Sequence, residues 1–154
     1  MVSTVQYQCA AQVLSTVPMM MGSIIREVHR ASESELSMHQ FRAMMMLRHH
    51  GSMPVSQMAE HLGVSLPAVS KLFDVMADRG FISRETPPED RRRVLVTLTD
   101  EGVQAVERVH QASIRYLASR MESLSEAELT VVTEAMALLQ VVFAHDHCAP
   151  QPVK

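Results

Sequence analysis

The chain has 154 residues, of which 47% are hydrophobic and 20% charged, with only 5 Gly and 7 Pro. This composition excludes collagen-like and disordered classes and is typical of one folded domain. The net charge of −3 gives no bulk attraction to nucleic acid, so any such function must rest on local charge. The only cysteines are Cys9 and Cys148, which favours a reducing, cytoplasmic compartment over a disulfide-stapled secreted fold.

The N-terminal 25 residues carry no charged side chain. Gln, Ser, Thr and Pro interrupt every apolar run there, which argues against a signal peptide and against a membrane span. We expect residues 1–15 to form an extension, either irregular or with a short helix of its own. A first helix should then run from about residue 17 to 32, with Pro18 in its first turn and its cap at Ser15 or Thr16.

Helical periodicity and caps predict the next three helices. Ser37 caps a helix over about residues 38–49, and a short helix over residues 54–62 ends at Gly63. Ser65 caps the next helix, which has Pro67 in its first turn and reaches Gly80. Two helices joined by a short turn that contains Gly predict a helix-turn-helix.

Two runs of β-forming residues follow, over residues 81–86 and 94–99. They flank a polar, proline-rich tip, residues 87–93, so they predict a β-hairpin with a charged end. Thr99 then caps a long helix that extends to about residue 123. Ser125 and Glu128 have the spacing of a capping box at the start of a last helix.

The last helix is apolar around most of its circumference. Two adjacent apolar stripes share it, made of Leu129, Val132, Met136, Leu139 and Phe143, and of Val131, Ala135, Leu138 and Val142. A single small helical domain offers too little surface to cover both stripes. We therefore expect a homodimer whose interface is built from the terminal helices.

Four short motifs occur in this order, and together with the order of elements they resemble the MarR family of bacterial transcriptional regulators. They are the helix start at residues 36–41, the helix-turn-helix core at 58–65, the segments 69–72 and 78–82, and the wing signature D-x-R-x-x-x-x-x-L-T made of Asp90, Arg92, Leu98 and Thr99, with Gly102 after it. The resemblance covers about residues 17–145.

The resemblance implies a mainly α fold with a small β-hairpin wing, a winged helix-turn-helix with long N- and C-terminal dimerisation helices. It divides one continuous domain into residues 1–35 (extension and first dimerisation helix), 36–99 (DNA-binding lobe) and 100–154 (C-terminal dimerisation helices and tail). The implied function is a homodimeric, sequence-specific DNA-binding regulator of a pseudo-palindromic operator on double-stranded DNA, a repressor relieved by a small aromatic or amphipathic ligand.

The second helix of a helix-turn-helix enters the major groove by its N-terminal end. This rule assigns DNA contacts to Ser65, Leu66, Pro67, Ala68, Ser70 and Lys71. The wing arginines Arg84, Arg91 and Arg93 are further candidates, because a narrow minor groove attracts guanidinium groups. In the family, Asp90 and Arg92 form an ion pair that positions the wing. Residues 66–68 are apolar where many relatives have polar side chains, so the preferred base sequence stays open.

The resemblance also places a ligand pocket where the dimerisation helices meet the DNA-binding lobe. The candidates are Met20, Met21, Ile24, His39, Arg42, Met45, Met46 and His110. Methionine walls beside Arg or His suit an amphipathic or aromatic acid. A methionine stripe at helical spacing is also typical of an ordinary core.

Cys9 and Cys148 are candidates for a thiol-based redox sensor, although no cation near Cys9 would activate its thiol. The run from His145 to Cys148 offers metal ligands, but no second ligand group at recognised spacing accompanies it, so we expect no metal and no cofactor. The sequence also shows no catalytic motif, which indicates that the chain is not an enzyme. The other alternative is a winged-helix protein-interaction module without DNA binding.

Overall fold

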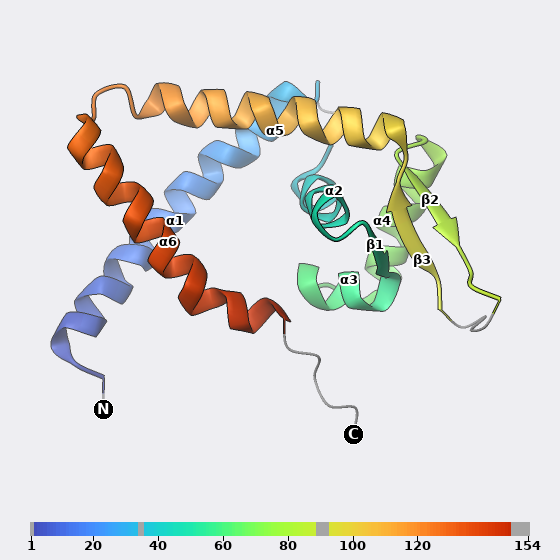
Figure 1. Cartoon of the computed structure of the whole chain (residues 1–154). Coiled ribbons are helices and arrows are strands. Elements are labelled where there is room, and N and C mark those ends of the chain that lie inside the picture. The colour runs from blue at the N-terminus through green and yellow to red at the C-terminus, as the bar shows by residue number, and fades with distance from the viewer. Residues whose placement is uncertain (1, 34–35, 89–92, 149–154) are drawn as a thin grey trace. The chain divides into compact units, whose positions relative to one another are not determined.

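The computed structural model describes residues 2–33, 36–88 and 93–148, with only the backbone for residues 144–148. It is mainly helical with a small antiparallel sheet, as the family resemblance implies (Figure 1). Residues 1–116 and 117–154 form two compact units. The elements are α1 (Thr4–Ala31), α2 (Met38–His50), β1 (Ser52–Pro54), α3 (Val55–Leu62), α4 (Leu66–Asp78), β2 (Ile82–Glu85), β3 (Leu95–Leu98), α5 (Asp100–Arg120) and α6 (Glu126–Cys148).

Helix α1 begins much earlier than the sequence analysis predicts. Ser3 and Gln6 form a capping box, in which the Ser3 side chain accepts from the Gln6 amide and the Gln6 side chain accepts from the Ser3 amide. The helix then continues through Pro18. The predicted start near residue 17 is therefore wrong. Helical structure in the first fifteen residues was left open, but it belongs to one continuous helix and not to a separate extension. The proposed cap Ser15 instead donates to the Gln12 carbonyl within the helix.

The core of the first unit fills the space between α2, α3, α4, the sheet and the first half of α5. Side chains from most of these elements are fully buried in it, including Leu47, Met58, Val69, Phe73, Met76, Val96 and Val106. Because α4 contributes Val69, Phe73 and Met76, one face of this helix is fixed and its other face is left for solvent or a partner.

The sheet has three strands in the order β1-β3-β2, where the sequence analysis predicts a two-stranded hairpin. Strand β1 pairs with β3 from Ser52 opposite Thr97 to Pro54 opposite Leu95. It is only three residues long and contains a proline, so it has no periodic signal of its own. Its role is to hold the end of α2 against the wing.

Thr99 joins the wing to α5. Its amide donates to the Phe81 carbonyl (3.1 Å), its hydroxyl donates to the Gly80 carbonyl (2.6 Å) and accepts from the Gly102 amide (3.0 Å). A Cβ at position 102 would lie 2.0 Å from the Phe81 carbonyl oxygen, so only glycine fits this close approach. The Leu-Thr and Gly of the wing signature therefore have a structural purpose.

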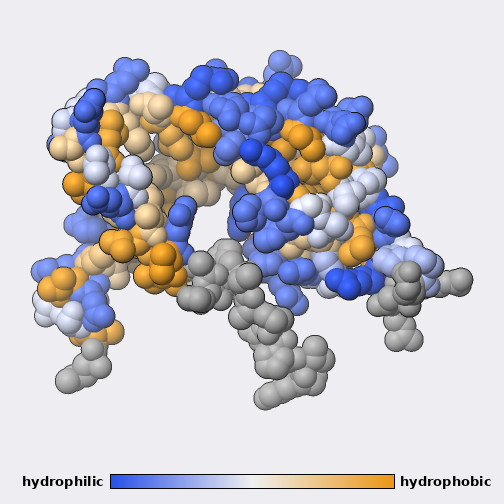
Figure 2. Space-filling view, in the orientation of Figure 1, coloured by the Kyte–Doolittle hydropathy of each residue, from blue (hydrophilic) through white to orange (hydrophobic). Residues whose placement is uncertain are grey.

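The second unit consists of the end of α5 and all of α6. The Ser125 amide and hydroxyl both donate to Glu128 Oε2, at 2.8 and 2.7 Å, which confirms the predicted cap. Large apolar side chains lie exposed along α6, and the same is true of α1 in the first unit (Figure 2). By length and composition alone α1 could cross a membrane, but a signal sequence or a core helix of a soluble protein meets the same test.

Candidate DNA-binding surface

The turn between α3 and α4 sets the direction of the second helix. Gly63 ends α3 in the left-handed conformation (φ 68°), and its amide returns to carbonyls of α3. Two residues later, Ser65 caps α4 by accepting a hydrogen bond from the Ala68 amide (3.4 Å). The helix-turn-helix that the sequence predicts is therefore present, with both ends of the turn fixed by local hydrogen bonds.

The residues predicted to touch DNA lie together at the N-terminal end of α4. Pro67, Ala68 and Lys71 are exposed at helical spacing, and Val75 continues the same face one turn further along with 43% of its surface exposed. Ser65 and Leu66 are exposed at the helix start, and Ser70 is half-buried. The sequence analysis missed Val75, although its i+4 spacing from Lys71 could have identified it.

This outward face of α4 offers few hydrogen-bond donors. Pro67 has no amide N–H, and the Ala68 amide already donates to Ser65. Lys71 supplies a positive charge, while Asp74 and Asp78 are negative and exposed on the same helix. Lys71 is therefore the side chain of this face best suited to a phosphate or a guanine edge.

The wing makes a direct contact with α4 through Arg84. Alternation along β2 places Arg84 on the same side as the buried Ile82, which faces α4. The Arg84 guanidinium lies 2.7 Å from the Asp74 carboxylate and donates to the Ser70 carbonyl at 3.1 Å. Two of the predicted DNA-binding residues, Arg84 and Ser70, are thus bonded to each other.

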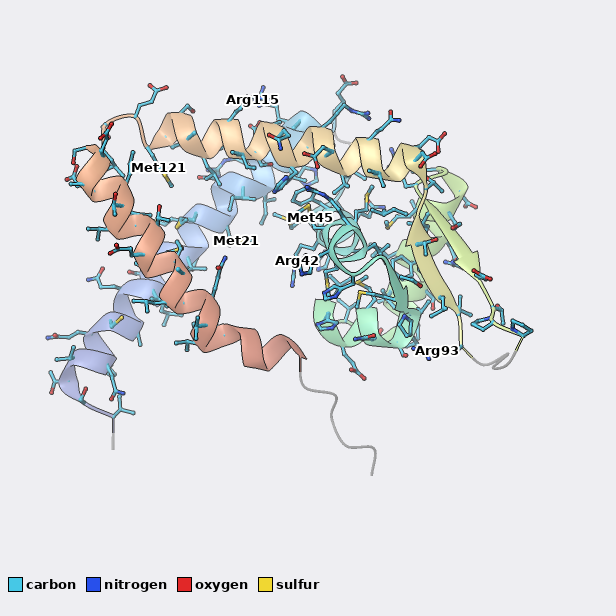
Figure 3. All side chains as sticks on the ribbon, in the orientation of Figure 1. Met21, Arg42, Met45, Arg93, Arg115 and Met121 are labelled. Atoms are coloured by element: carbon cyan, nitrogen blue, oxygen red, sulfur yellow. The ribbon has the colours of Figure 1, made fainter. Side chains whose placement is uncertain are left out.

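Ser83 lies on the other face of β2, where it meets a side chain of the paired strand β3. Ser83 and Thr97 are register partners, and their hydroxyl oxygens lie 2.7 Å apart. The predicted positioning pair Asp90 and Arg92 and the predicted groove residue Arg91 lie outside the described residues. Arg93, the last of the wing candidates, is exposed just before β3 (Figure 3).

Comparison with known proteins agrees with this geometry. Residues 36–94 match the MarR family model. A helix-turn-helix transcriptional regulator of Bacillus subtilis, YfiV, is 33% identical over 105 residues, which make up 68% of this chain and 66% of that protein. This chain belongs to the MarR family. It is a DNA-binding transcriptional regulator and not an enzyme.

Several solved structures share the fold of this chain. RV1404 of Mycobacterium tuberculosis has a TM-score of 0.78 at 22% identity, with 98% of this chain and 99% of that one covered. A MarR variant of E. coli in complex with operator DNA has a TM-score of 0.65 at 21% identity, over 83% and 93% of the two chains. NadR in complex with 4-hydroxyphenylacetate has a TM-score of 0.64 at 19% identity, over 84% and 89%.

The residues predicted to hold an effector of this MarR-family regulator lie on α1, α2 and α5. Met20, Met21 and Ile24 are half-buried on α1, as are Met45 and Met46 on α2. Figure 3 labels Met21 and Met45 on these two helices. The polar candidates His39 and Arg42 are exposed, and His110 is half-buried. Ile24, Met45 and Met46 pack against the core, so part of this methionine set has the structural role that the sequence analysis left open.

Arg48 connects several of these groups and was missed by the sequence analysis. Its Nη1 lies 2.9 Å from the Glu107 carboxylate, 3.2 Å from His110 Nδ1 and 3.9 Å from the Met45 sulfur. An arginine only donates, so His110 Nδ1 accepts and the ring proton of the neutral form is on Nε2. The i+3 spacings of Met45 and Arg48, and of Glu107 and His110, are visible in the sequence, but nothing local pairs Arg48 with Glu107 or His110.

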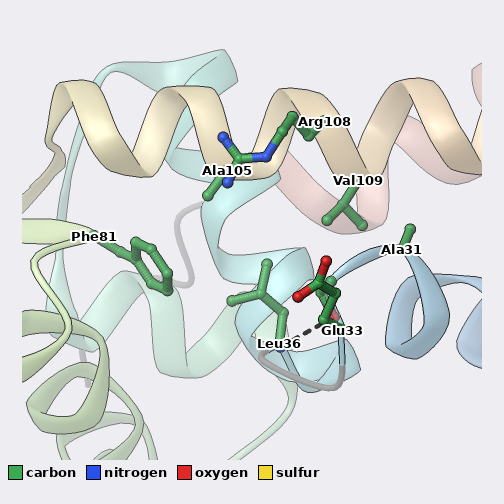
Figure 4. Close-up of a pocket in the computed structure, with 8 residues that line it drawn as sticks. Ala31, Glu33, Leu36, Phe81, Ala105, Arg108 and Val109 are labelled. Carbon is green, nitrogen blue, oxygen red and sulfur yellow. Dashed lines mark hydrogen bonds between the residues drawn. The ribbon is translucent and has the colours of Figure 1, made fainter.

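A cavity of about 230 Å³ opens elsewhere in the first unit (Figure 4). Its lining comes from the end of α1, the turn after it, the start of the wing and α5, namely Ala31, Ser32, Glu33, Leu36, Phe81, Ala105, Arg108 and Val109. None of the eight predicted effector residues is among them. Its volume is below the range of about 300–1,000 Å³ that is usual for ligand pockets.

The two cysteines stay untested as a redox pair. Cys9 is exposed on α1 and has no disulfide partner among the residues whose side chains are described. The side chain of Cys148 and the residues His145–His147 beside it fall outside that described part.

Proposed function

We propose that this MarR-family protein is a homodimeric, cytoplasmic regulator that represses transcription by binding a pseudo-palindromic operator. The observation that carries the proposal is the exposed face of α4, with Pro67, Ala68 and Lys71 at its N-terminal end and the wing joined to it through Arg84. A recognition helix presented in this way reaches the major groove, while the wing lies against the adjacent backbone and minor groove.

The dimer is supported by the apolar side chains that each terminal helix leaves exposed. On α1, Leu14 is 77% and Met19 is 67% exposed, and on α6, Leu138 is 69% and Val142 is 64% exposed. A soluble monomer does not normally present so many large apolar groups along two long helices. A second copy of the chain covers them, and its twofold symmetry gives two recognition helices.

The test of DNA binding is a selection from random duplexes with the purified full chain, followed by fluorescence anisotropy on the selected site. We expect a pseudo-palindrome with half-sites about 10 bp apart, because two symmetric recognition helices enter successive major grooves. A protein that shows no preference among duplexes, or that is retained by none at low salt, contradicts the proposal and favours the protein-interaction alternative.

The proposed effector is a small aromatic or amphipathic acid. Half-buried methionines on α1 and α2 supply an adaptable apolar surface with Arg42 and His39 nearby. NadR, a protein of the same fold, binds 4-hydroxyphenylacetate, which is an acid of this class. The ligand should bind the DNA-incompetent form better, so ligand and operator each weaken the affinity for the other by the same factor.

The effector experiment measures operator affinity with 4-hydroxyphenylacetate and, as a control, a straight-chain carboxylate of similar size. A coupling of about 1–3 kcal/mol is typical, which is roughly a 5- to 150-fold loss of affinity. Transcription in vitro from a promoter that contains the operator then reports repression and its relief. Activation instead of repression would reject that part of the proposal while leaving DNA binding intact.

A further inference from the structure

Arg84 is placed where a DNA contact is expected, yet its guanidinium is occupied within the protein. It bridges two residues one helical turn apart on α4, with the Asp74 carboxylate at 2.7 Å and the Ser70 carbonyl at 3.1 Å. About two thirds of its side-chain surface is covered, since the exposed fraction is 34%. Two of its N–H groups are therefore used within the protein, and they hold the guanidinium in one orientation against α4.

The bridge lies where it can influence the orientation of the wing relative to α4. The chain passes from α4 into β2 through a turn at Arg79 and Gly80, which the Thr99 hydroxyl holds by bonding to the Gly80 carbonyl. Arg84 lies further along β2, toward the wing tip. The bridge is therefore a further attachment of β2 to the recognition helix.

Asp74, the acidic partner of Arg84, is unusual in its position on a helix expected to bind DNA. It is an exposed acid on the outward side of a helix that should meet a polyanion, and 60% of its side chain is accessible. An unneutralised carboxylate there would repel phosphate. The contact with Arg84 cancels this charge and gives the residue a purpose that DNA recognition alone does not.

We propose that Arg84 and Asp74 form a clamp that positions the wing on the recognition helix, so that Arg84 acts on DNA affinity without touching DNA. The role rests on the proposed operator binding and deepens it. With the clamp closed, α4 and the wing meet the major groove and its neighbouring minor groove at one fixed spacing. Without it the wing must be ordered at the moment of binding, which lowers affinity.

The experiment measures operator affinity over a range of salt concentrations for Arg84→Gln, Asp74→Ala and the double variant. Arg84→Gln should weaken binding roughly two- to tenfold, the cost of ordering one or two mobile side chains. The slope of log affinity against log salt should stay that of the parent. A lost phosphate contact would instead reduce the slope by about 0.9.

Asp74→Ala separates the two roles by the sign of its effect. If Arg84 is a clamp residue, removal of its partner weakens binding by a similar factor, and the double variant is no weaker than either single one. If Arg84 contacts DNA, loss of an acidic side chain frees the arginine and strengthens binding. Asp78→Ala is the matched control, because it removes the same charge from the next turn of α4 and should not weaken binding.

A reduced salt slope in Arg84→Gln, or an Asp74→Ala variant that binds as tightly as the parent or tighter, overturns the clamp. Melting temperatures should change little in all these variants, since partly exposed ion pairs contribute little to stability. A parent protein that is retained by no duplex at low salt overturns the proposed function itself, and the clamp with it.

Discussion

The winged helix-turn-helix lobe and the terminal helices differ in how much of their apolar side-chain surface is buried within one chain. On α4, Val69 and Phe73 are fully buried against neighbouring elements, whereas on α1 and α6 Leu14 and Leu138 are 77% and 69% exposed. The lobe satisfies its own hydrophobic pattern within one chain. The terminal helices leave large apolar side chains exposed within one chain. In the proposed function the lobe reads DNA, and the terminal helices join two lobes in a dimer.

The largest effect is expected where the terminal helices depend on a partner. Leu138→Glu places a charge at a site that is exposed in one chain and covered in the proposed dimer. Burial of an unpaired carboxylate should cost about 3 kcal/mol or more per copy, and each dimer carries two. Sedimentation should show a folded monomer or an aggregate, with operator binding lost.

Thr133→Glu is the matched control, since Thr133 belongs to the narrow polar side of α6, where a new carboxylate stays in water. It should remain dimeric. A Leu138→Glu protein that sediments as the parent does would show that α6 is not covered by a second copy.

Two glycines compare how tightly the backbone is packed where the wing meets α5 and on α1. At Gly102 the Cβ of alanine would lie 2.0 Å from the Phe81 carbonyl oxygen, whereas at Gly22 on α1 the nearest heavy atom is the end of Arg26 at 3.6 Å. Gly102→Ala should destabilise the fold by about 3 kcal/mol, because backbone must move. Gly22→Ala should stabilise it by about 0.5–1 kcal/mol, because glycine weakens a helix interior.

Urea unfolding at one fixed protein concentration measures both variants. Opposite signs are the expected result. A tolerated Gly102→Ala would mean that the joint between the wing and α5 can shift, and the tight packing inferred for the lobe would be wrong.

Lys71→Ala tests DNA binding by the lobe without a change in the terminal helices. Lys71 is the exposed cation of the outward face of α4, so its loss should weaken binding to all duplexes roughly three- to tenfold and reduce the salt slope by about 1. The dimer should be unaffected in sedimentation. A variant that keeps the full salt slope would show that Lys71 does not contact a phosphate. The exposed face of α4 would then contact DNA only through apolar side chains.

Local signals explain why most of the lobe was predictable. Ser37, Ser65, Thr99 and Ser125 each make a hydrogen bond three residues along the chain, so their helix starts can be recognised in sequence. The start of α1 had the same signal in Ser3 and Gln6, but Pro18 pointed to a later start. A proline inside a helix removes one hydrogen bond, and a helix of 28 residues tolerates that loss.

The features that were not predictable depend on contacts between distant residues. Strand β1 exists through its pairing with β3, more than forty residues later. Arg48 reaches Glu107 and His110 across a still longer separation. The role of Arg84 depends on how β2 lies on α4, so sequence alone identified a basic wing residue and not its internal partners.

The smallest expected effect comes from a comparison of two N-terminal helix caps, that of α2 in the lobe and that of α6. They differ in the side chain that accepts the hydrogen bond from the serine amide. At α2 the Ser37 amide donates to the neutral Gln40 side chain (2.8 Å), and at α6 the Ser125 amide donates to the Glu128 carboxylate (2.8 Å). The hydrogen bonds from the Ser125 backbone and hydroxyl lower the pKa of Glu128 below its usual value, and burial opposes this shift only weakly. The cap of α6 therefore titrates, and the cap of α2 does not.

The direction of the pKa shift of Glu128 determines how stability depends on pH. A carboxyl with a lowered pKa in the folded state adds stability that is fully present above the ordinary glutamate pKa and is lost as the pH falls through the folded value. Amide chemical shifts recorded between about pH 3 and pH 6 should move for Ser125, with a midpoint below the ordinary glutamate pKa, and stay constant for Ser37. Glu128→Gln should abolish the movement at Ser125, because it makes the cap of α6 chemically the same as that of α2. If Ser37 moves together with Ser125, the change reflects acid unfolding of the whole chain and the two caps do not differ in the way their chemistry requires.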